Sequence, residues 1–407
     1  MTAYRCRNLV TMDSGEFVDG VFVVDGNCFG PVGRAADVLP HHHGELVDLG
    51  EVIVLPGLIN AHCHLEYTLL RGSILPSRNF PKWIERINAL KRSLTDHDYV
   101  RGIELGLQEL RRYGVTTVLN IVSAPQVMPL LSPPVIRSWF CLELIDVRPR
   151  PWLDDHAFGS WLFFESSKSW LGGFGLSPHA PYTASADLYR LSNESARSFQ
   201  MPWTTHVSES WPEYQMFAAG RGELFDFLQK MGRRMDDCGA MSPLSYLLSS
   251  KLVDNRCIIV HANELDDVDF TLLARPEWRN LSIVHCPKSH RFLHHNRFSM
   301  EKLCDLGLNI CIGTDSLASN DSLNLFAEMR MARRNYPFLT SFDLLEMVTL
   351  NPARALQQDG RLGRIAPGFL ADAIAIPYSG NAEKVCDAIV ENRSSIEWMI
   401  VDGKLVK

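Results

Sequence analysis

The fold is decided by the segment LPGLINAHCH, residues 55–64. After a proline and a glycine, a short apolar run of strand-like composition ends in His62, Cys63 and His64. Side chains two positions apart on an extended strand point to the same face, so both imidazoles can reach one ion. Imidazole nitrogen suits zinc, iron or manganese. An H-x-H pair alone is a weak signal, so its meaning depends on the rest of the chain.

Strand-like runs rich in β-branched and aromatic residues recur along the middle of the chain. Stretches with helical spacing separate them, such as DYVRGIELGLQELRRYG (98–114), which ends at a glycine. Eight alternating β and α units predict an α/β fold, a parallel (β/α)8 barrel of the TIM type. The eight predicted strands lie at 57–64, 115–122, 135–145, 173–180, 202–209, 257–263, 281–287 and 308–316.

Both ends of the chain have a different composition from the middle. Residues 1–56 alternate short apolar runs with turn signals such as VDGN, and the tail repeats this style in WMIVDGKLVK. We therefore expect a small β-sandwich domain assembled from residues 1–56 and 366–407, with the barrel occupying 57–365.

Composition excludes several classes of function. The chain has 407 residues, 46% of them hydrophobic, and a net charge of -7. No uninterrupted apolar run is long enough to span a membrane, and the N-terminus lacks the apolar core of a signal peptide. No basic stripe alternates with aromatics, so a nucleic-acid partner is not expected. Ten cysteines are scattered without a C-x-x-C pair, which is typical of reduced thiols in a cytoplasmic protein.

Polar residues able to bind a metal end several of the predicted strands. The active site of such barrels gathers at the carboxyl ends of the strands. A single histidine beside an apolar run is usually a core residue, but several at successive strand ends of one barrel are hard to explain that way. Besides the first pair, these strand-end residues are His179, His206, Glu209, His261, His285 and Asp315.

The successive motifs resemble those of the amidohydrolase superfamily, in particular its mononuclear deaminase and chlorohydrolase branch. The resemblance covers nearly the whole chain, including the terminal TLNPARAL and GRIAPGFLADAIAI stretches. Binuclear relatives need a lysine at the end of strand four, where this chain reads GLSPHAP, so the resemblance implies a single metal ion. The motifs that carry it are LPGLINAHCH, SPHAPYT, THVSES, IVHAN, HCPKSH and CIGTDS.

The resemblance implies a role for each strand-end residue. The metal ligands would be His62, His64, His206 and Asp315, holding one divalent transition metal, zinc first, with Fe²⁺ or Mn²⁺ as alternatives. Chemistry supports these assignments, because water whose pKa is brought toward neutrality by a metal supplies hydroxide. Glu209 would protonate the ring nitrogen and then the departing ammonia. His261 would orient the water, and Asp315 would accept its proton.

The substrate expected from the resemblance is an adenine nucleoside, which would lose its 6-amino group as ammonia. In HLEYT and HCPKSH, Glu66 and His290 favour aminodeoxyfutalosine deaminase of menaquinone biosynthesis. His179 is expected to contact the nucleoside, and Trp83, which by default is a core residue, could wall the purine pocket. Arg148 is placed to pair with a substrate carboxylate, although an ordinary loop arginine is an equal alternative.

Other interpretations of the function stay open. The substrate could be S-adenosylhomocysteine, methylthioadenosine or adenosine, or a free base such as guanine or cytosine, or a triazine dechlorinated by the same chemistry. A metal-free scaffold is disfavoured because every ligand position is filled, and a cyclic-amide hydrolase because the strand-four lysine is missing. The sequence does not assign His285 or the histidines at 41–43, and it leaves open whether the chain forms a homodimer.

Overall fold

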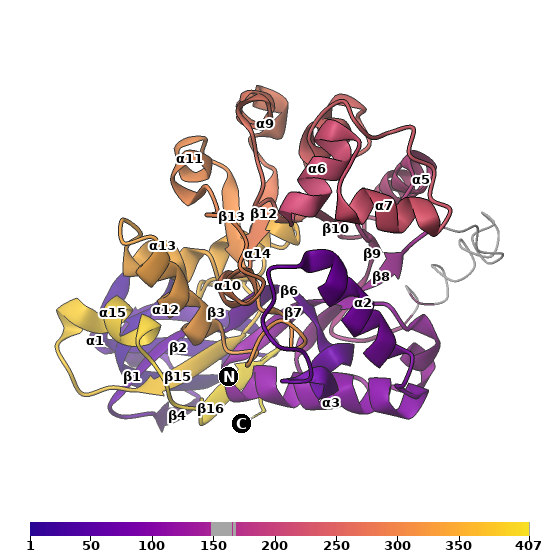
Figure 1. Cartoon of the computed structure of the whole chain (residues 1–407). Coiled ribbons are helices and arrows are strands. Elements are labelled where there is room, and N and C mark those ends of the chain that lie inside the picture. The colour runs from indigo at the N-terminus through magenta and orange to yellow at the C-terminus, as the bar shows by residue number, and fades with distance from the viewer. Residues whose placement is uncertain (148–164, 166–167, 407) are drawn as a thin grey trace.

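Eight parallel strands form the centre of the computed structural model, which describes residues 1–147, 165 and 168–406. Each overlaps one of the eight segments predicted from the sequence, so the predicted strands are confirmed (Figure 1). They are β6 (Leu58–His64), β7 (Val115–Val122), β8 (Arg137–Leu144), β9 (Gly172–Pro178), β10 (Thr204–Val207), β11 (Ile258–His261), β12 (Ser282–His285) and β13 (Asn309–Ile312).

Backbone hydrogen bonds join the two ends of this strand order. Between β9 and β10, the N–H of Leu176 donates to the carbonyl of Pro202 at 3.1 Å. On the opposite side, the chain leaves β13 and enters a two-residue strand, β14 (Asp315–Ser316), which pairs in parallel with the end of β6. There the N–H of Thr314 donates to the carbonyl of His62 at 3.0 Å. The strand order therefore returns on itself as a barrel.

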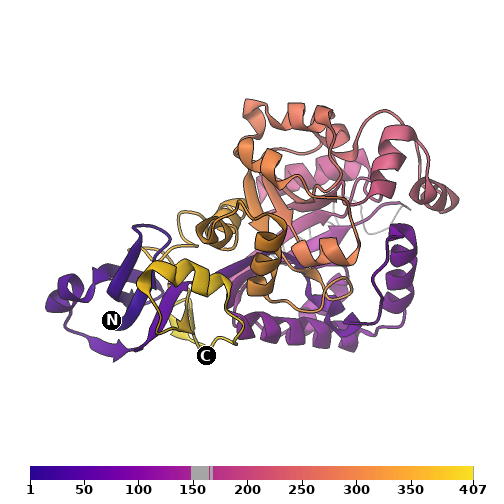
Figure 2. The same cartoon turned by 60° about the vertical axis from the view of Figure 1, so that its left-hand side comes forward.

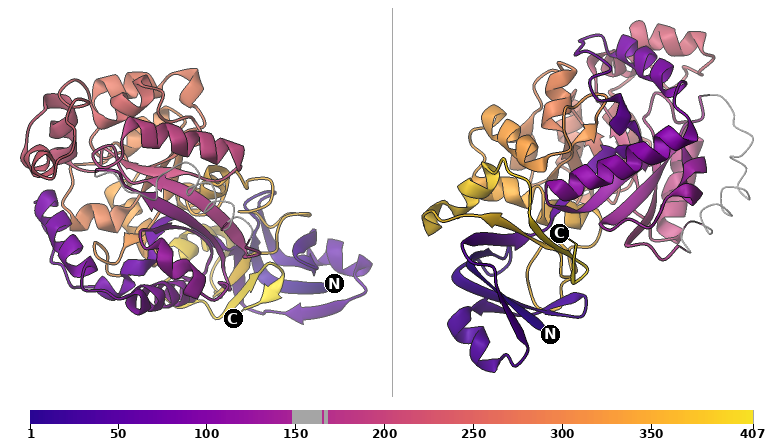
Figure 3. Two further views of the ribbon diagram at one scale, coloured as in Figure 1. Left: turned by 90° about the vertical axis from the view of Figure 1, so that its right-hand side faces the viewer. Right: turned by 90° about the horizontal axis from the view of Figure 1, so that it is seen from below.

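Helices surround this barrel (Figures 1 and 3). None of those in the described part of the chain is long and apolar enough to cross a membrane. Helix α1 (Ala35–Val38) is an exception, because it lies away from the barrel, against strands of the N-terminal part of the chain. The other helices of the described residues are α2 (Phe80–Lys91), α3 (Asp96–Arg112), α5 (Ala186–Ser198), α6 (Trp211–Ala219), α7 (Glu223–Lys230), α8 (Pro243–Ser249), α9 (Asp267–Leu273), α10 (Pro287–Phe292), α11 (Met300–Asp305), α12 (Leu325–Asn335), α13 (Ser341–Glu346), α14 (Leu350–Ala355) and α15 (Val385–Val390).

Helix α3 shows how the local sequence positions the segment after the first two histidines. A capping box of Thr95 and Asp98 starts the helix, as the side chain of each bonds to the backbone N–H of the other. Its glycines face the short 3-10 segment η2 (Leu65–Leu70). A Cβ on Gly102 would lie 2.8 Å from the backbone oxygen of Glu66. The glycine therefore lets the helix pack directly against the chain that leaves β6.

Strands from both ends of the chain form one separate sheet beside the barrel (Figure 2). Its order is β17-β16-β15-β5-β1-β2-β3, with β4 paired to β1, and β15 runs antiparallel to β5. The composite sheet expected from both termini is thus present, whereas its description as a sandwich and the domain boundaries stay predictions. The strands are β1 (Thr2–Val10), β2 (Glu16–Asp25), β3 (Cys28–Arg34), β4 (Glu45–Asp48), β5 (Val52–Pro56), β15 (Ala373–Pro377), β16 (Trp398–Val401) and β17 (Lys404–Leu405).

A buried ion pair ties the barrel to this sheet. Arg137, at the start of β8, donates to Asp372 at 3.2 and 3.3 Å and to Asp402 at 3.1 Å. Fixing three charged groups with hydrogen bonds at one junction defines how the two parts of the molecule meet.

Candidate active site

Three imidazoles from two strands meet at the carboxyl end of the barrel. His62 and His64 end β6 and His206 lies on β10; their rings are 4.9 to 5.4 Å apart between centroids. One ring nitrogen from each lies within 4.8 Å of the others, and all three side chains are buried. The cluster therefore has the spacing of a metal site.

An irregularity in β6 turns both of its histidines into the site. Ile59 and Ala61 point into the apolar interior of the barrel, together with residues of other strands. In a regular strand, Cys63 would be the next side chain to point into the barrel. However, the pairing of β6 with β7 shifts register between Asn60 and Cys63. After the shift the inward positions are His62 and His64. The H-x-H spacing predicted a shared face, but it did not predict this change of face.

The protonation and partners of these imidazoles suit metal binding. The Nδ1 of His206 lies 2.8 Å from the carbonyl of His179, which can only accept, so Nδ1 carries the proton and Nε2 keeps its lone pair. His62 is fully buried, and neither of its ring nitrogens has a hydrogen-bond partner. Burial, followed by the charges of His206 and His179, holds the pKa of His62 well below its ordinary value. A buried imidazole without hydrogen-bond partners, beside two others at this spacing, fits a divalent metal ion.

Asp315 supplies a carboxylate beside the same cluster. Its Oδ1 lies 3.8 Å from the Nε2 atoms of both His62 and His64. Ser289 donates to Oδ2 at 2.6 Å, and the residue itself has a left-handed φ of 58°. The connection from β13 can reach this position because Gly313 passes close to β6, where a Cβ would lie 2.8 Å from the carbonyl of His62.

Glu209 and His261 form a second pair next to the metal cluster. Glu209 Oε1 is 3.7 Å from His261 Nε2 and 3.8 Å from His295 Nε2. Burial raises the pKa of Glu209 to about 8; the charge of His206 opposes the rise and that of Asp315 adds to it. A buried carboxyl whose pKa is raised in this way can donate and recover a proton, as a general acid must. Burial lowers the pKa of His261, so its imidazole is neutral.

These groups lie at one end of a cavity of about 750 Å³. Apolar and aromatic side chains of α2 and α7 line much of it, among them Phe80, Trp83 and Phe227. Phe80 and Trp83 stack with centroids 5.8 Å apart. A cavity of this size with aromatic walls and a few polar groups suits a small planar ligand.

Comparison with known proteins places this site in a family. The model of the amidohydrolase family matches residues 53–134 and 161–406. The chain belongs to the amidohydrolase family. It is therefore a hydrolase, as the sequence motifs indicated.

Individual relatives of this amidohydrolase are nucleoside deaminases. It is 30% identical to a 5-methylthioadenosine/S-adenosylhomocysteine deaminase of Pyrococcus furiosus, over 81% of this chain and 76% of the relative. Its fold is similar to that of aminofutalosine deaminase from Helicobacter pylori in complex with methylthio-coformycin, with a TM-score of 0.89, 20% identity and full coverage of both chains. A zinc-bound adenosine deaminase from Xanthomonas campestris matches with a TM-score of 0.82 and 24% identity, over 99% and 92% of the two chains. These structural likenesses support the barrel fold.

The residues expected to bind substrate divide into two groups. Trp83 and His179 line the cavity, and Thr183 holds the Nδ1 of His179 at 2.6 Å. Glu66 does not reach it: the side chain is fully buried, and its Oε1 accepts from the N–H of Ser123 at 2.7 Å. His290 also lies off the cavity wall and contacts Asn263 at 3.0 Å. Arg148 lies outside the described residues.

The amidohydrolase cavity also contains charged residues that the sequence analysis missed. Lys91 lines it from the last turn of α2, with Nζ 4.8 Å from the centroid of the Tyr67 ring. Trp83, Ile87 and Lys91 recur every fourth residue on the cavity side of this helix, which is a helical pattern the sequence already contained. Glu143 lines the cavity from the carboxyl end of β8, where the strand-end rule could have found it.

His285 is one strand-end histidine that the structure keeps out of the cavity. It is fully buried and stacks on Phe298 with centroids 4.2 Å apart. Burial holds its pKa well below the ordinary value, so the ring is neutral. Its position among aromatic rings is that of a core residue beneath the site.

Proposed function

We propose that this amidohydrolase is a hydrolytic deaminase of adenine nucleosides. Water adds to C6 of the adenine ring, and the bond between C6 and the amino nitrogen breaks. Ammonia is released, and the nucleoside keeps a 6-oxo group. The observation that carries the proposal is the position of Glu209, 3.7 Å from His261 beside the histidine cluster, on the wall of an aromatic cavity. Relatives named as deaminases of methylthioadenosine and S-adenosylhomocysteine support it.

Each buried group has a defined task in this reaction. His62, His64, His206 and Asp315 would hold one divalent metal ion, for which we propose zinc. When bound, such an ion lowers the pKa of water and supplies the nucleophile at neutral pH.

Proton transfer falls to the side chains around that ion. Glu209 donates its proton to the ring nitrogen next to C6, which makes the carbon electrophilic. His261 orients the water through a hydrogen bond, and Asp315 accepts the first proton that the water loses. As the 6-oxo group forms, Glu209 takes up the second water proton and passes it to the departing amino group, which leaves as ammonia. The proton on Asp315 then returns to Glu209 and completes the cycle.

For the substrate we propose 6-amino-6-deoxyfutalosine, whose arm carries an aryl carboxylate. Lys91 supports this assignment, because its ammonium lies in the cavity and has no ion-pair partner in the described residues. Tyr67 contacts both this ammonium and His64, on whose ring it stacks with centroids 5.6 Å apart. A nucleoside with its adenine at the metal end would therefore direct a substituent of its ribose toward Lys91. S-adenosylhomocysteine or methylthioadenosine is the second candidate, favoured by the 30% identical relative.

A panel of adenine nucleosides tests the proposal on the metal-loaded enzyme. Conversion is followed by the ultraviolet shift from adenine to hypoxanthine and by ammonia release. The expected order of kcat/KM places the carboxylated nucleoside first. Higher efficiency on S-adenosylhomocysteine or methylthioadenosine would select the second candidate. Ammonia release from guanine or cytosine, or dechlorination of a triazine, with no reaction on any nucleoside, would contradict the nucleoside deaminase itself.

Three further assignments complete the proposal. The barrel domain spans 57–365, and the composite β domain spans 1–56 and 366–407. The enzyme acts in the cytoplasm, since all ten cysteines are free thiols. It acts on a free nucleoside, without a nucleic-acid or membrane partner, either as a single chain or as a homodimer.

A further inference from the structure

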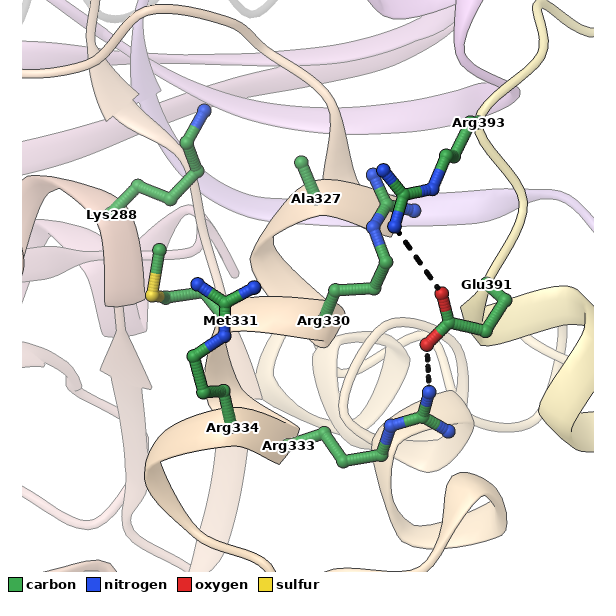
Figure 4. Close-up of a pocket in the computed structure, with 8 residues that line it drawn as sticks. All are labelled: Lys288, Ala327, Arg330, Met331, Arg333, Arg334, Glu391 and Arg393. Atoms are coloured by element: carbon green, nitrogen blue, oxygen red, sulfur yellow. Dashed lines mark hydrogen bonds and ion pairs between the residues drawn. The ribbon is translucent and has the colours of Figure 1, made fainter.

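A second cavity, of about 440 Å³, lies outside the proposed active site and shares none of its lining residues (Figure 4). One face of α12 forms its floor, since Ala327, Arg330, Met331 and Arg334 follow the i, i+3, i+4, i+7 spacing of a helix surface. Lys288 of α10 and the segment 391–393 after α15 complete the lining.

The charge of this cavity is strongly positive, although the whole chain carries -7. Five of its lining residues are cationic, and Glu391 is the only acidic one. Figure 4 shows that Glu391 is shared between Arg333 and Arg393, the latter at 3.8 Å. Asp387 also pairs with Arg333 at 3.4 Å, and Asp321 pairs with Lys288. Three carboxylates therefore face five cations, which leaves an excess of positive charge.

Arg330 shows that this positive charge is concentrated rather than spread over the surface. Its guanidinium donates to the backbone carbonyls of Val390, at 3.3 Å, and Asn392, so neutral groups fix it in place. Burial, and after it the nearby charge of Arg393, lowers its pKa. Arg334 has no ion-pair partner among the described residues. Guanidinium groups held close together without enough carboxylates are the arrangement that binds oxyanions.

Lys288 extends the cationic rim toward the proposed active site. Its ammonium pairs with the exposed Asp321 and contacts Ser322 at 3.0 Å. The next residue, Ser289, donates to Asp315 at 2.6 Å. The second cavity and the metal-competent cluster therefore share the short helix α10.

We propose that this cavity is a binding site for a small multivalent oxyanion, a phosphate or the phosphate chain of a nucleotide. The guanidinium groups of Arg330, Arg334 and Arg393 would bind its oxygens, and Lys288 would add a charge at the rim. The volume is in the range of small-molecule sites. The negative charges of the ligand would pair with the cations that the carboxylates of the protein do not neutralise.

Calorimetric titration of the full-length, metal-loaded enzyme tests the proposal with pyrophosphate, inorganic phosphate and uridine diphosphate. Uridine diphosphate carries no adenine and so does not resemble the proposed substrate. We expect one saturable site for pyrophosphate that weakens as salt is raised, because surface charge interactions are screened. Metal content is measured after each titration, since pyrophosphate can chelate zinc. Tighter binding of uridine diphosphate would identify a nucleotide as the ligand, and equal binding would identify the phosphate groups; both support the site.

Two variants make the test specific to this cavity. Arg334→Ala with Arg393→Ala removes two exposed cations and should weaken pyrophosphate about tenfold or more. Arg101→Ala removes an exposed arginine from α3 and should bind like the wild type. If the double variant is unstable, Arg334→Ala alone serves, because that side chain has no ion-pair partner in the described structure. No saturable binding at millimolar pyrophosphate, or unchanged affinity in the Arg334 variants, would overturn the proposal.

Discussion

Glu213 accepts a hydrogen bond of 2.7 Å from the backbone N–H of Glu209, so the buried carboxyl group of Glu213 fixes the backbone at Glu209. Its second oxygen accepts from the N–H of Ser208 at 3.0 Å, where the backbone has a left-handed φ of 52°. Glu213 is fully buried at the start of α6. It therefore fixes the turn that links His206 to Glu209, without lining the cavity itself.

Glu213→Ala should lower kcat by about 10²-fold with little change in KM, because a small misplacement of Glu209 reduces proton transfer more than substrate binding. Steady-state kinetics on the best nucleoside measures both constants. Glu213→Gln keeps one acceptor oxygen and should recover part of the loss. Metal content and circular dichroism serve as controls, and an unchanged kcat in a folded Ala variant would contradict a positioning role.

Glu209→Gln should keep the metal but lower turnover by about 10²–10⁴-fold, because an amide cannot donate and recover a proton. Elemental analysis and single-turnover kinetics measure the two properties separately. The neighbouring Ser208→Ala variant controls for disturbance of the turn. Turnover near the wild-type rate in Glu209→Gln would remove this residue from the mechanism.

The enzyme should bind one equivalent of a divalent metal, since the described cluster contains one set of three histidines with Asp315 beside it. Removal by a chelator should abolish deamination, and one equivalent of Zn²⁺ should restore it. His206→Ala should lower the metal content, whereas His285→Ala leaves it unchanged because that ring packs on Phe298. Two equivalents that are both needed for activity would contradict the single-metal site.

The sequence predicted the strands of the barrel and the histidines at their carboxyl ends because both rest on short-range patterns. Each strand has its own apolar run, and topology brings strand ends together whatever the connecting loops do. The strand-end rule therefore located His206 and Asp315 without any contact information. Positions that depend on packing between distant segments were harder to predict. Glu66 lies two residues after His64, yet its carboxyl accepts from the N–H of Ser123 and does not line the cavity.

Two features could not be predicted from local patterns at all. The register shift in β6 exists only in its pairing with β7, so nothing inside residues 58–64 signals it. The cationic cavity combines α10, α12 and the segment after α15, which are far apart in the chain. By contrast, Lys91 was within reach of a helical-spacing analysis, because it continues the Trp83 face of α2.

The buried Glu328 should make the protein less stable as the pH rises. Burial, opposed by Lys288, raises its pKa to about 8 from an ordinary 4.5. The folded state therefore keeps a proton that the unfolded state releases, so the free energy of unfolding falls between about pH 4.5 and 8. The loss is at most about 5 kcal/mol. Glutamine does not titrate, so the Tm of Glu328→Gln relative to the wild type should increase from pH 5 to pH 8.

Parallel Tm curves for the two proteins across that range would contradict a neutral Glu328. The comparison is insensitive to other effects of the substitution. Glu328 accepts from the N–H of Lys288 at 2.9 Å and from Asn320 at 2.7 Å, and the loss of one of these bonds adds an offset that does not depend on pH. Metal loading is kept equal at every pH, because a bound metal ion itself stabilises the folded protein.

Lys91→Met tests whether the ammonium group of Lys91 selects a carboxylated substrate. This test rests on the proposed deaminase activity. Methionine keeps most of the length of the side chain and removes its charge, so kcat/KM on 6-amino-6-deoxyfutalosine should fall about tenfold. The value on methylthioadenosine should change little, because that nucleoside has no carboxylate. Lys82→Met removes an exposed lysine of the same helix that does not line the cavity, and it should behave like the wild type on both substrates. Equal losses of kcat/KM on both nucleosides in Lys91→Met would make Lys91 a structural residue. An unchanged preference for the carboxylated nucleoside, with no loss on either substrate, would move carboxylate recognition to Arg148. Arg148→Ala gives the corresponding test.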